Sequence, residues 1–303
     1  MRFRTVSLIV MPSTDRPVPT LPPLTALLRV ARAAARAGGR RTLEAFGGRV
    51  DAEKKWDGSP VTATDRASEA EVRRVIYQTY PTHTIVGEEG GVSEGDPRVR
   101  WIIDPIDGTK SFIHGVPLYS VLVAVALDGR PSVGVIHLPA LGETVDAATG
   151  LGCHWNGRSA HVSTTSRLKD ATLLTTSVRA LEAEGIPFRR LSSATKTQRG
   201  WGDGYGFALV ATGRVDAMVD VGLKIWDSAP LLPILEEAGG RFTDWAGKRS
   251  ITSPNVLGSN GLLHDSFLRL LESSEPNPRA SRARSGLRPR SWSRVPRQRR
   301  PVP

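Results

Sequence analysis

Several stretches of the chain have the apolar spacing and the stop signals of helices. In residues 24–46 and 65–80, apolar side chains recur at intervals of three and four, and Gly47-Gly48 and Pro81 follow them. Further helices are predicted at 205–212 before Gly213, at 227–238 before Gly239-Gly240, and at 262–271. The helices are therefore spread over both halves of the chain.

Short apolar runs between these helices predict strands. They cover residues 84–87, 100–104, 120–127, 132–138, 144–148, 171–177, 215–221, 241–243 and 255–258. The runs at 120–127 and 132–138 flank the sequence D-G-R-P, which is typical of a hairpin turn. Hairpins and intervening helices together predict an α/β fold of stacked layers with mixed sheets.

The net charge of +11 is concentrated at one end of the chain. Residues 274–303 hold nine Arg and one Glu, which leaves 32 basic and 29 acidic residues, a charge of +3, for the remainder. This Arg-, Pro- and Ser-rich tail has little to bury and is predicted to be disordered. Its charge would give at most weak binding to nucleic acid, and a tail without function fits equally well.

The remaining composition predicts an ordinary globular protein of the cytoplasm. No run approaches the ~18 apolar residues of a membrane span. Residues 1–23 are interpreted as a disordered N-terminal extension, of the kind that an over-called start produces. A single cysteine, Cys153, excludes an intrachain disulfide and fits a reducing compartment. We expect Cys153 to be a small packed residue, and the scattered histidines show no zinc-ligand spacing.

Residues 100–112, R-W-I-I-D-P-I-D-G-T-K-S-F, place two carboxylates three positions apart. Asp104 is at the carboxyl end of a predicted buried strand, where ligand sites of α/β sheets collect. Pro105 is expected to end that strand and to bend the chain, which brings Asp107 back toward Asp104. Two carboxylates held together repel each other unless a cation lies between them, and oxygen ligands alone suit Mg²⁺.

The residues that follow are suited to a phosphate. Gly108 allows a close backbone approach, and a helix beginning after it would aim the amides of Gly108 and Thr109 at an anion. The stretch therefore suggests a metal-assisted phosphatase. A turn whose aspartates cap backbone amides explains this stretch alone equally well.

Three other carboxylates stand at the ends of predicted elements. They are Asp65 in V-T-A-T-D, Glu88 in G-E-E-G, and Asp227 in I-W-D-S-A-P. Each alone fits a helix cap or a solvated acid. Together with D-P-I-D-G-T they form an ordered set that resembles the inositol monophosphatase superfamily of Mg²⁺-dependent phosphatases, over residues 24–272.

The resemblance implies an αβαβα sandwich, a homodimer and two or three Mg²⁺ ions per site. It divides the domain into a metal-site half, about 24–150, and a substrate-side half, about 151–272, with a tail at 273–303. The implied metal ligands are Glu88, Asp104, the Ile106 carbonyl, Asp107 and Asp227. The resemblance further implies that Asp65 and Thr109 activate the attacking water, with Glu88 contributing to catalysis, and that the Gly108 and Thr109 amides bind phosphate.

The choice of phosphate ester rests on the second half of the chain. The stretches D-G-T-K-S-F-I-H-G-V-P-L and T-Q-R-G-W-G-D-G-Y-G-F are most similar to the bacterial histidinol-phosphatase branch. Family members that act on inositol phosphates usually carry small residues in place of Trp201 and Asp203. Asp203 and Asp220 are the candidates to face the ammonium of histidinol phosphate, and the other predicted substrate contacts are Trp201, Arg199 and Lys110.

Each of these residues also has a structural interpretation. Asp203 fits a turn between glycines, Trp201 fits core packing, and Lys110 and Arg199 fit a solvated surface. The alternative functions are an inositol-1-phosphate phosphatase or another phosphatase of small phosphate esters. A non-catalytic, RNA-associated regulatory member is an alternative from a different class.

Overall fold

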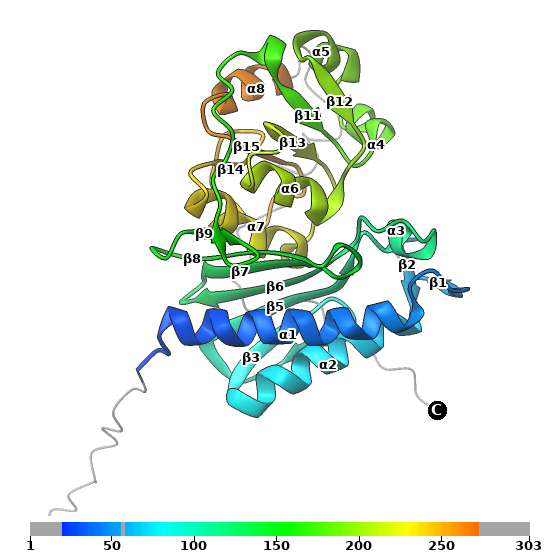
Figure 1. Ribbon diagram of the computed structural model, residues 1–303, viewed down its shortest axis with the longest axis vertical. Coiled ribbons are helices and arrows are strands. Elements are labelled where there is room, and N and C mark those ends of the chain that lie inside the picture. The colour runs from blue at the N-terminus through cyan, green and yellow to red at the C-terminus, as the bar shows by residue number, and fades with distance from the viewer. Residues whose placement is uncertain (1–19, 56–57, 273–303) are drawn as a thin grey trace, which may run out of the picture.

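The computed structural model describes residues 20–55 and 58–272. These residues form a five-layer sandwich in the order helix, sheet, helix, sheet, helix (Figure 1). The larger sheet contains β3 (His83–Gly87), β4 (Gly91–Ser93), β5 (Asp96–Asp107), β6 (Ser120–Leu127), β7 (Arg130–Leu138), β8 (Glu143–Ala148), β9 (Cys153–Trp155) and β10 (Arg158–Ser159). Its order is β10-β9-β8-β7-β6-β5-β3-β4, with β3 and β5 parallel and the other neighbours antiparallel. The predicted 120–138 hairpin is therefore confirmed.

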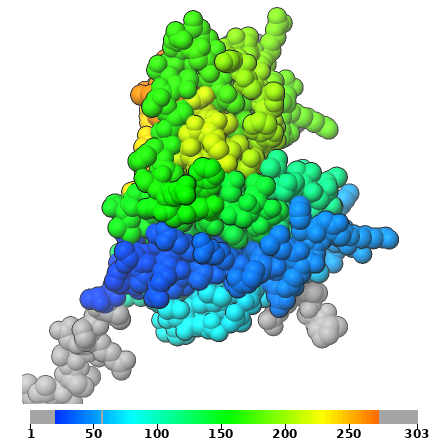
Figure 2. Space-filling model, viewed as in Figure 1, coloured from blue at the N-terminus to red at the C-terminus, as the bar shows by residue number. Residues whose placement is uncertain are grey.

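Helices α1 (Leu24–Ala45) and α2 (Ala63–Thr79) cover the outer face of the large sheet, as Figures 1 and 2 show. The side chains of strand β6 alternate between two hydrophobic cores, one on each face of the large sheet. Val121, Val123 and Val125 point to the α1 and α2 side, whereas Leu122 and Ala124 point to the opposite side. This alternation follows from the two-residue period of a strand.

The middle layer consists of α6 (Asp203–Ala211) and α7 (Ile225–Glu237), between the two sheets. The second sheet contains β11 (Thr172–Leu174), β12 (Thr197–Arg199), β13 (Ala217–Asp220), β14 (Arg241–Asp244) and β15 (Val256–Ser259), in the order β12-β11-β13-β15-β14. Cys153 is buried in the core of this middle layer, as expected for a packed residue.

The outermost layer consists of α4 (Val178–Ala183), α5 (Phe188–Ala194) and α8 (His264–Leu271). Leu181, Leu191 and Phe267 pack from these helices onto the second sheet. The smaller elements are the hairpin β1 (Ala52–Lys54) and β2 (Pro60–Thr62), helix α3 (Thr109–Ile113), and the 3₁₀ turns Pro139–Leu141 and Leu168–Asp170. The α/β sandwich with mixed sheets is thus confirmed.

The expected break of the strand at Pro105 is wrong. Strand β5 continues to Asp107, and a bulge lies between Asp104 and Asp107. A proline that lacks an N–H is tolerated at a bulge because the ladder is already interrupted there. A short helix, α3, does begin after Gly108, which was the condition for aiming the Gly108 and Thr109 amides at an anion.

The predictions for the two ends of the chain fall mostly outside the described residues. Residues 1–19 and 273–303 belong to that part, so the predicted extension and basic tail stay predictions. Leu21 and Leu24 are described and pack against the core beneath α1. Among the helices of the described residues, none has the length and apolar character needed to cross a membrane.

Candidate metal and phosphate site

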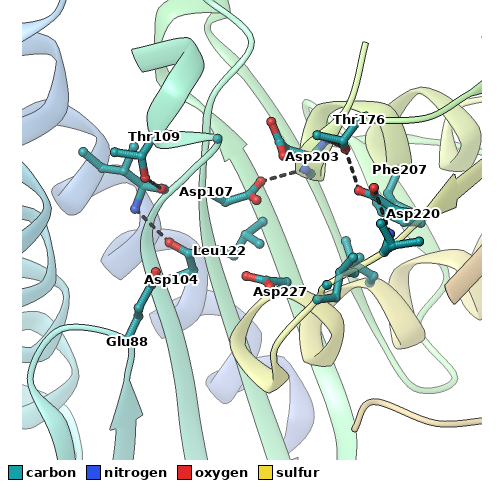
Figure 3. Close-up of a pocket in the computed structure, with 17 residues that line it drawn as sticks. Glu88, Asp104, Asp107, Thr109, Leu122, Thr176, Asp203, Phe207, Asp220 and Asp227 are labelled. Atoms are coloured by element: carbon teal, nitrogen blue, oxygen red, sulfur yellow. Dashed lines mark hydrogen bonds between the residues drawn. The ribbon is translucent and has the colours of Figure 1, made fainter. Parts of the chain in front are cut away.

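The bulge in β5 places two carboxylates on one face of the sheet. Asp104 pairs with Leu122 and Asp107 pairs with Ser120, so three positions on β5 match two on β6. In a regular strand, residues three apart would point to opposite faces. The extra residue removes that difference, and Figure 3 shows both side chains facing the same cavity.

Asp227 completes the cluster from the second half of the chain. It lies in the first turn of α7, where its carboxylate accepts a hydrogen bond from the backbone N–H of Lys224 at 2.6 Å. Asp104, Asp107 and Asp227 each offer a carboxylate oxygen, and these oxygens lie within 4.8 Å of one another. Two sequence-distant segments therefore build one acidic cage.

Glu88 approaches this cage from the turn between β3 and β4, and it lines the same cavity. Lys55 reaches this turn from the β1–β2 hairpin, with its Nζ 2.6 Å from Glu88 Oε1 and 2.5 Å from Glu89 Oε1. The pKa of Glu88 is raised by burial, against the opposing effect of Lys55.

Burial and mutual repulsion raise the pKa values in the cage. The pKa of Asp107 rises to about 7 through burial and the charge of Asp203, and that of Asp227 rises to about 7 through burial and the charge of Asp107. The pKa of Asp104 is well above its ordinary value because of burial and the charges of Glu88 and Asp227. A cation removes this repulsion, and the set, all carboxylates without Cys or His, fits a hard divalent metal.

Asp107 is fixed by two hydrogen bonds to one of its oxygens. Ser120 Oγ donates at 2.6 Å, and the N–H of Gly204 donates at 2.6 Å from the start of α6. A Cβ at position 204 would lie 2.6 Å from the Asp107 carboxylate. Glycine at this position is therefore what lets the second half of the chain approach the metal side so closely.

A second pair of carboxylates lies at the other end of the cavity (Figure 3). Thr176 Oγ1 donates to Asp220 at 2.6 Å and accepts the N–H of Asp203 at 2.9 Å. Burial and the charge of Asp220 raise the pKa of Asp203 to about 7, and burial raises the pKa of Asp220 to about 7. The cavity thus has acidic groups at both ends.

Comparison with known proteins accounts for this arrangement. Residues 24–275 match the Inositol monophosphatase family. The chain belongs to this family. It is 40% identical to a histidinol-phosphatase of Chlorobaculum parvum, an alignment that covers 77% of this chain and 94% of the relative.

Solved structures agree with the family fold. The extragenic suppressor protein SuhB of Bartonella henselae superposes with a TM-score of 0.78 at 28% identity, covering 82% of this chain and all of that one. An inositol monophosphatase of Thermotoga maritima gives a TM-score of 0.75 at 35% identity, covering 81% of this chain and 96% of that one. The resemblance seen in the sequence motifs is confirmed, and relatives with different names share this fold.

Most of the residues predicted from inositol monophosphatase family motifs meet in one cavity. Its lining includes nine of them: Glu88, Asp104, Ile106, Asp107, Gly108, Thr109, Asp203, Asp220 and Asp227. Gly108 adopts a positive φ of 80° as the residue preceding α3, a conformation that favours glycine. Thr109 Oγ1 donates to the Ile106 carbonyl at 3.0 Å, so the threonine predicted to act in catalysis and the predicted carbonyl ligand are in direct contact.

Asp65 is buried at the start of α2 and does not line the cavity. Its carboxylate accepts hydrogen bonds from the N–H of Thr62 at 2.8 Å and from Thr62 Oγ1 at 2.5 Å. The Asp65 N–H in turn donates to Thr62 Oγ1 at 3.4 Å, and this bond forms a capping box with the bond from the Thr62 N–H. The pKa of Asp65 is raised, chiefly by burial.

Three predicted substrate contacts lie outside the cavity lining. Trp201 is 42% exposed. Arg199 is exposed and donates to the carbonyl of its neighbour Gln198 at 2.7 Å. Lys110 is also exposed, although its charge lowers the pKa of Asp203 and so reaches the cavity. Their roles in binding stay predictions.

Two residues of the site were missed by the sequence reasoning. Thr176 connects the Asp220 carboxylate to the backbone N–H of Asp203, and Ser120 fixes Asp107. Thr176 follows the carboxyl end of β11, which is where ligand-contacting residues of α/β sheets are expected. Ser120 begins β6 and gives no signal of its own, because its role depends on the register with β5.

Proposed function

We propose that this member of the inositol monophosphatase family is a Mg²⁺-dependent phosphatase that hydrolyses L-histidinol phosphate to L-histidinol and phosphate. The observation that carries the substrate choice is the Asp203–Thr176–Asp220 group at the end of the cavity away from Glu88 and Asp104. The similarity to a histidinol-phosphatase supports the same choice.

The metal assignment uses the carboxylate cage. Asp104, Asp107 and Asp227 would hold one Mg²⁺, and Glu88, Asp104 and the Ile106 carbonyl would hold another. Bound Mg²⁺ would supply Lewis acidity to the phosphoryl oxygens and lower the pKa of coordinated water. The oxygen-only ligand set and the raised pKa values of the cage support a hard divalent cation at this position.

The protein groups would perform the remaining steps. The backbone N–H groups of Gly108 and Thr109, which line the cavity, would bind the phosphate. Asp65, with Thr109, would orient the attacking water and accept its proton, and the capping contacts with Thr62 would keep the Asp65 carboxylate in place. In-line attack would then transfer the phosphoryl group directly to water, and the leaving oxygen, at the end of the cavity near Asp203 and Asp220, would take up a proton from water to give the alcohol.

Asp203 and Asp220 would bind the leaving group. Histidinol carries a primary ammonium, and an ammonium placed in a partly desolvated pocket is costly unless a carboxylate faces it. Burial, together with neighbouring carboxylates, raises the pKa values of Asp203 and Asp220, and an ammonium placed beside them would favour their charged forms. The cavity volume of about 200 Å³ is below the ~300–1,000 Å³ typical of drug-sized ligands, which suits a small ester.

A substrate panel tests this proposal. Phosphate release in Mg²⁺ is measured from histidinol phosphate, inositol 1-phosphate, fructose 1,6-bisphosphate and phosphoadenosine phosphate. We expect the highest kcat/KM for histidinol phosphate. A preference for inositol 1-phosphate would overturn the proposed substrate but would leave the proposed phosphatase activity intact. An absence of Mg²⁺-dependent hydrolysis across the panel would instead favour a non-catalytic role.

A further inference from the structure

The turn that carries Glu88 is covered by helix α2. Gly87 and Gly91 pair at the ends of β3 and β4, so residues 88–90 form the connection. In Figure 1, α2 lies along the outer face of the large sheet, next to β3. Because Glu88 belongs to such a short connection, the position of its side chain depends on what holds the connection in place.

Glu69 of α2 holds this turn through its main chain. One carboxylate oxygen accepts the N–H of Glu89 at 2.8 Å, and the other accepts the N–H of Gly90 at 2.8 Å. The side chain of Glu69 is only 3% exposed. A buried carboxylate that accepts two backbone N–H groups makes charge-assisted hydrogen bonds, which are stronger than neutral ones.

Arg73, one turn further along α2, completes the contact. Its Nε donates to Glu69 at 2.7 Å, its second terminal nitrogen donates to the Gly91 carbonyl at 2.6 Å, and its first donates to Ser93 Oγ at 2.9 Å. The guanidinium thereby neutralises the Glu69 charge, and its hydrogen bonds connect α2 to β4 as well as to the turn. The pair fits the condition for a stable buried ion pair, since both partners are hydrogen-bonded.

The glycines of the turn fit this arrangement closely. A Cβ at position 87 would lie 2.2 Å from a Glu69 carboxylate oxygen, and a Cβ at position 90 would lie 2.6 Å from the same atom. The carboxylate therefore lies directly against the backbone on both sides of Glu88. In this geometry a shift of the Glu69 side chain is transmitted to the backbone that bears Glu88.

We infer that Glu69 is a positioning residue for the metal site, which, with Arg73, fixes the backbone of the β3–β4 turn so that Glu88 is aimed at the carboxylate cage before a metal binds. The inference rests on the proposed divalent-metal function and adds a residue to it. Glu69 itself contacts the turn and not the cage. Its expected signature is therefore a loss of metal affinity, with less effect on turnover at saturating metal.

The test compares Glu69→Gln with Glu71→Gln. Both variants remove one negative charge from α2, but the carboxylate of Glu71 is paired with Arg74 on the same helix and, among the described residues, has no hydrogen bond to the turn. Calorimetric titration of the metal-free full-length protein with Mg²⁺ measures the Kd. We expect a Kd about ten- to a hundredfold weaker for Glu69→Gln, the usual cost of removing a partner that orients a ligand, and no change for Glu71→Gln.

A second variant addresses the possibility that Glu69→Gln does not fold. Gly90→Ala keeps both charges of the pair and places a methyl group against the Glu69 carboxylate, and it should also weaken Mg²⁺ binding. In the wild-type protein, hydrogen exchange of the Glu89 and Gly90 amides should be slow. Exchange at the rate of an open turn would overturn the inference whatever the variants do.

The outcomes separate this inference from the proposed function. Wild-type affinity for Mg²⁺ in a folded Glu69→Gln protein, with the wild type binding normally, overturns the role of Glu69 alone. A wild-type protein that binds no Mg²⁺ overturns both. Equal losses of Mg²⁺ affinity in Glu69→Gln and Glu71→Gln would mean that the effect comes from the removal of one negative charge from α2. That result would also overturn the positioning role of Glu69.

Discussion

The sequence predicted which residues belong to the site better than it predicted how the backbone brings them together. The motif D-P-I-D-G-T identified Asp104 and Asp107 as a pair, and the structure brings them together. The β-bulge that brings them together was not predictable. From the sequence, Pro105 was expected to end the strand, whereas the strand continues through Pro105 with a bulge. Bulges depend on the partner strand, and the partner register is not written in the local sequence.

The substrate end offers a residue-scale prediction. Asp203→Asn should lower kcat/KM for histidinol phosphate by about ten- to a hundredfold, the equivalent of losing a charge-assisted hydrogen bond worth roughly 1.5–3 kcal/mol. Steady-state kinetics with histidinol phosphate and with glycerol phosphate measure the effect. The uncharged leaving group of glycerol phosphate should be affected much less, because it brings no ammonium for Asp203 to pair with.

Two features make Asp203→Asn a clean substitution for this experiment. Its φ is +53°, in the left-handed region that asparagine also tolerates, so the substitution keeps the backbone conformation. Its N–H donates to Thr176, a contact that asparagine also retains. If both substrates lost activity equally, Asp203 would be supporting the fold of the cavity and not recognising the leaving group.

At the scale of elements, the long helices and strands were predictable from the sequence, whereas most of the short ones were not. The long helices and the 120–138 hairpin were predicted within a few residues of their observed bounds. Helices α4 and α5, and strands β1, β2, β4, β9, β10 and β12, were missed. Elements of two to seven residues complete too few periods for a hydrophobic pattern to appear, and their conformations depend on neighbours that are distant in sequence.

His264 links helix α8 to two strands of the second sheet and predicts a pH effect on stability. It is fully buried at the start of α8, with Nδ1 2.8 Å from Ser259 Oγ on β15 and Nε2 2.8 Å from Thr243 Oγ1 on β14. Because Thr243 donates its own hydroxyl hydrogen to the Asp244 carbonyl, Nε2 is the protonated nitrogen and Nδ1 accepts. Burial, with a contribution from Arg241 and against that of Asp265, lowers the pKa of His264 to about 4.

The sign follows from proton linkage. The unfolded state binds a proton at His264 below about pH 6.5, whereas the folded state does not until about pH 4. The contribution of His264 to the free energy of unfolding should therefore fall as pH falls through this window, by up to about 1.4 kcal/mol per pH unit, whereas the buried carboxyls with raised pKa values act in the opposite direction and are common to the wild type and the variant. Urea unfolding at several pH values should show a smaller slope in His264→Gln than in the wild type.

His161→Gln is the matched control because this side chain is exposed. It should leave the pH slope unchanged. An identical slope in the wild type and His264→Gln would mean that the buried imidazole does not govern this part of the acid response, and other titrating groups would have to account for it.

At the scale of the whole molecule, the site is a joint product of the two halves of the chain. Glu88, Asp104 and Asp107 come from the first sheet, whereas Asp203, Asp220 and Asp227 come from the middle helices and the second sheet. The sequence placed these residues in order along the chain. Their meeting at one cavity follows from the stacking of the layers, which local patterns do not specify.

The basic tail supports a prediction for the whole chain. Removing residues 274–303 should leave the melting temperature and kcat nearly unchanged, since this stretch has few apolar residues and carries none of the motif residues. It should reduce salt-sensitive retention on a nucleic-acid column. Melting curves and steady-state kinetics of the truncated protein check this, and a large fall in melting temperature would show that the stretch packs on the domain.

The most direct test of the account is phosphate release from histidinol phosphate by the wild type and by Asp104→Asn, each with Mg²⁺ and with excess chelator. Asp104 is buried at the centre of the carboxylate cage, so its loss should lower kcat/KM by more than about 100-fold, beyond the cost of an outer partner of a metal ligand. The wild type should lose activity in chelator and regain it when Mg²⁺ is restored. Undiminished hydrolysis by Asp104→Asn, or by the wild type without divalent metal, would contradict the assignment of this cage as the metal centre.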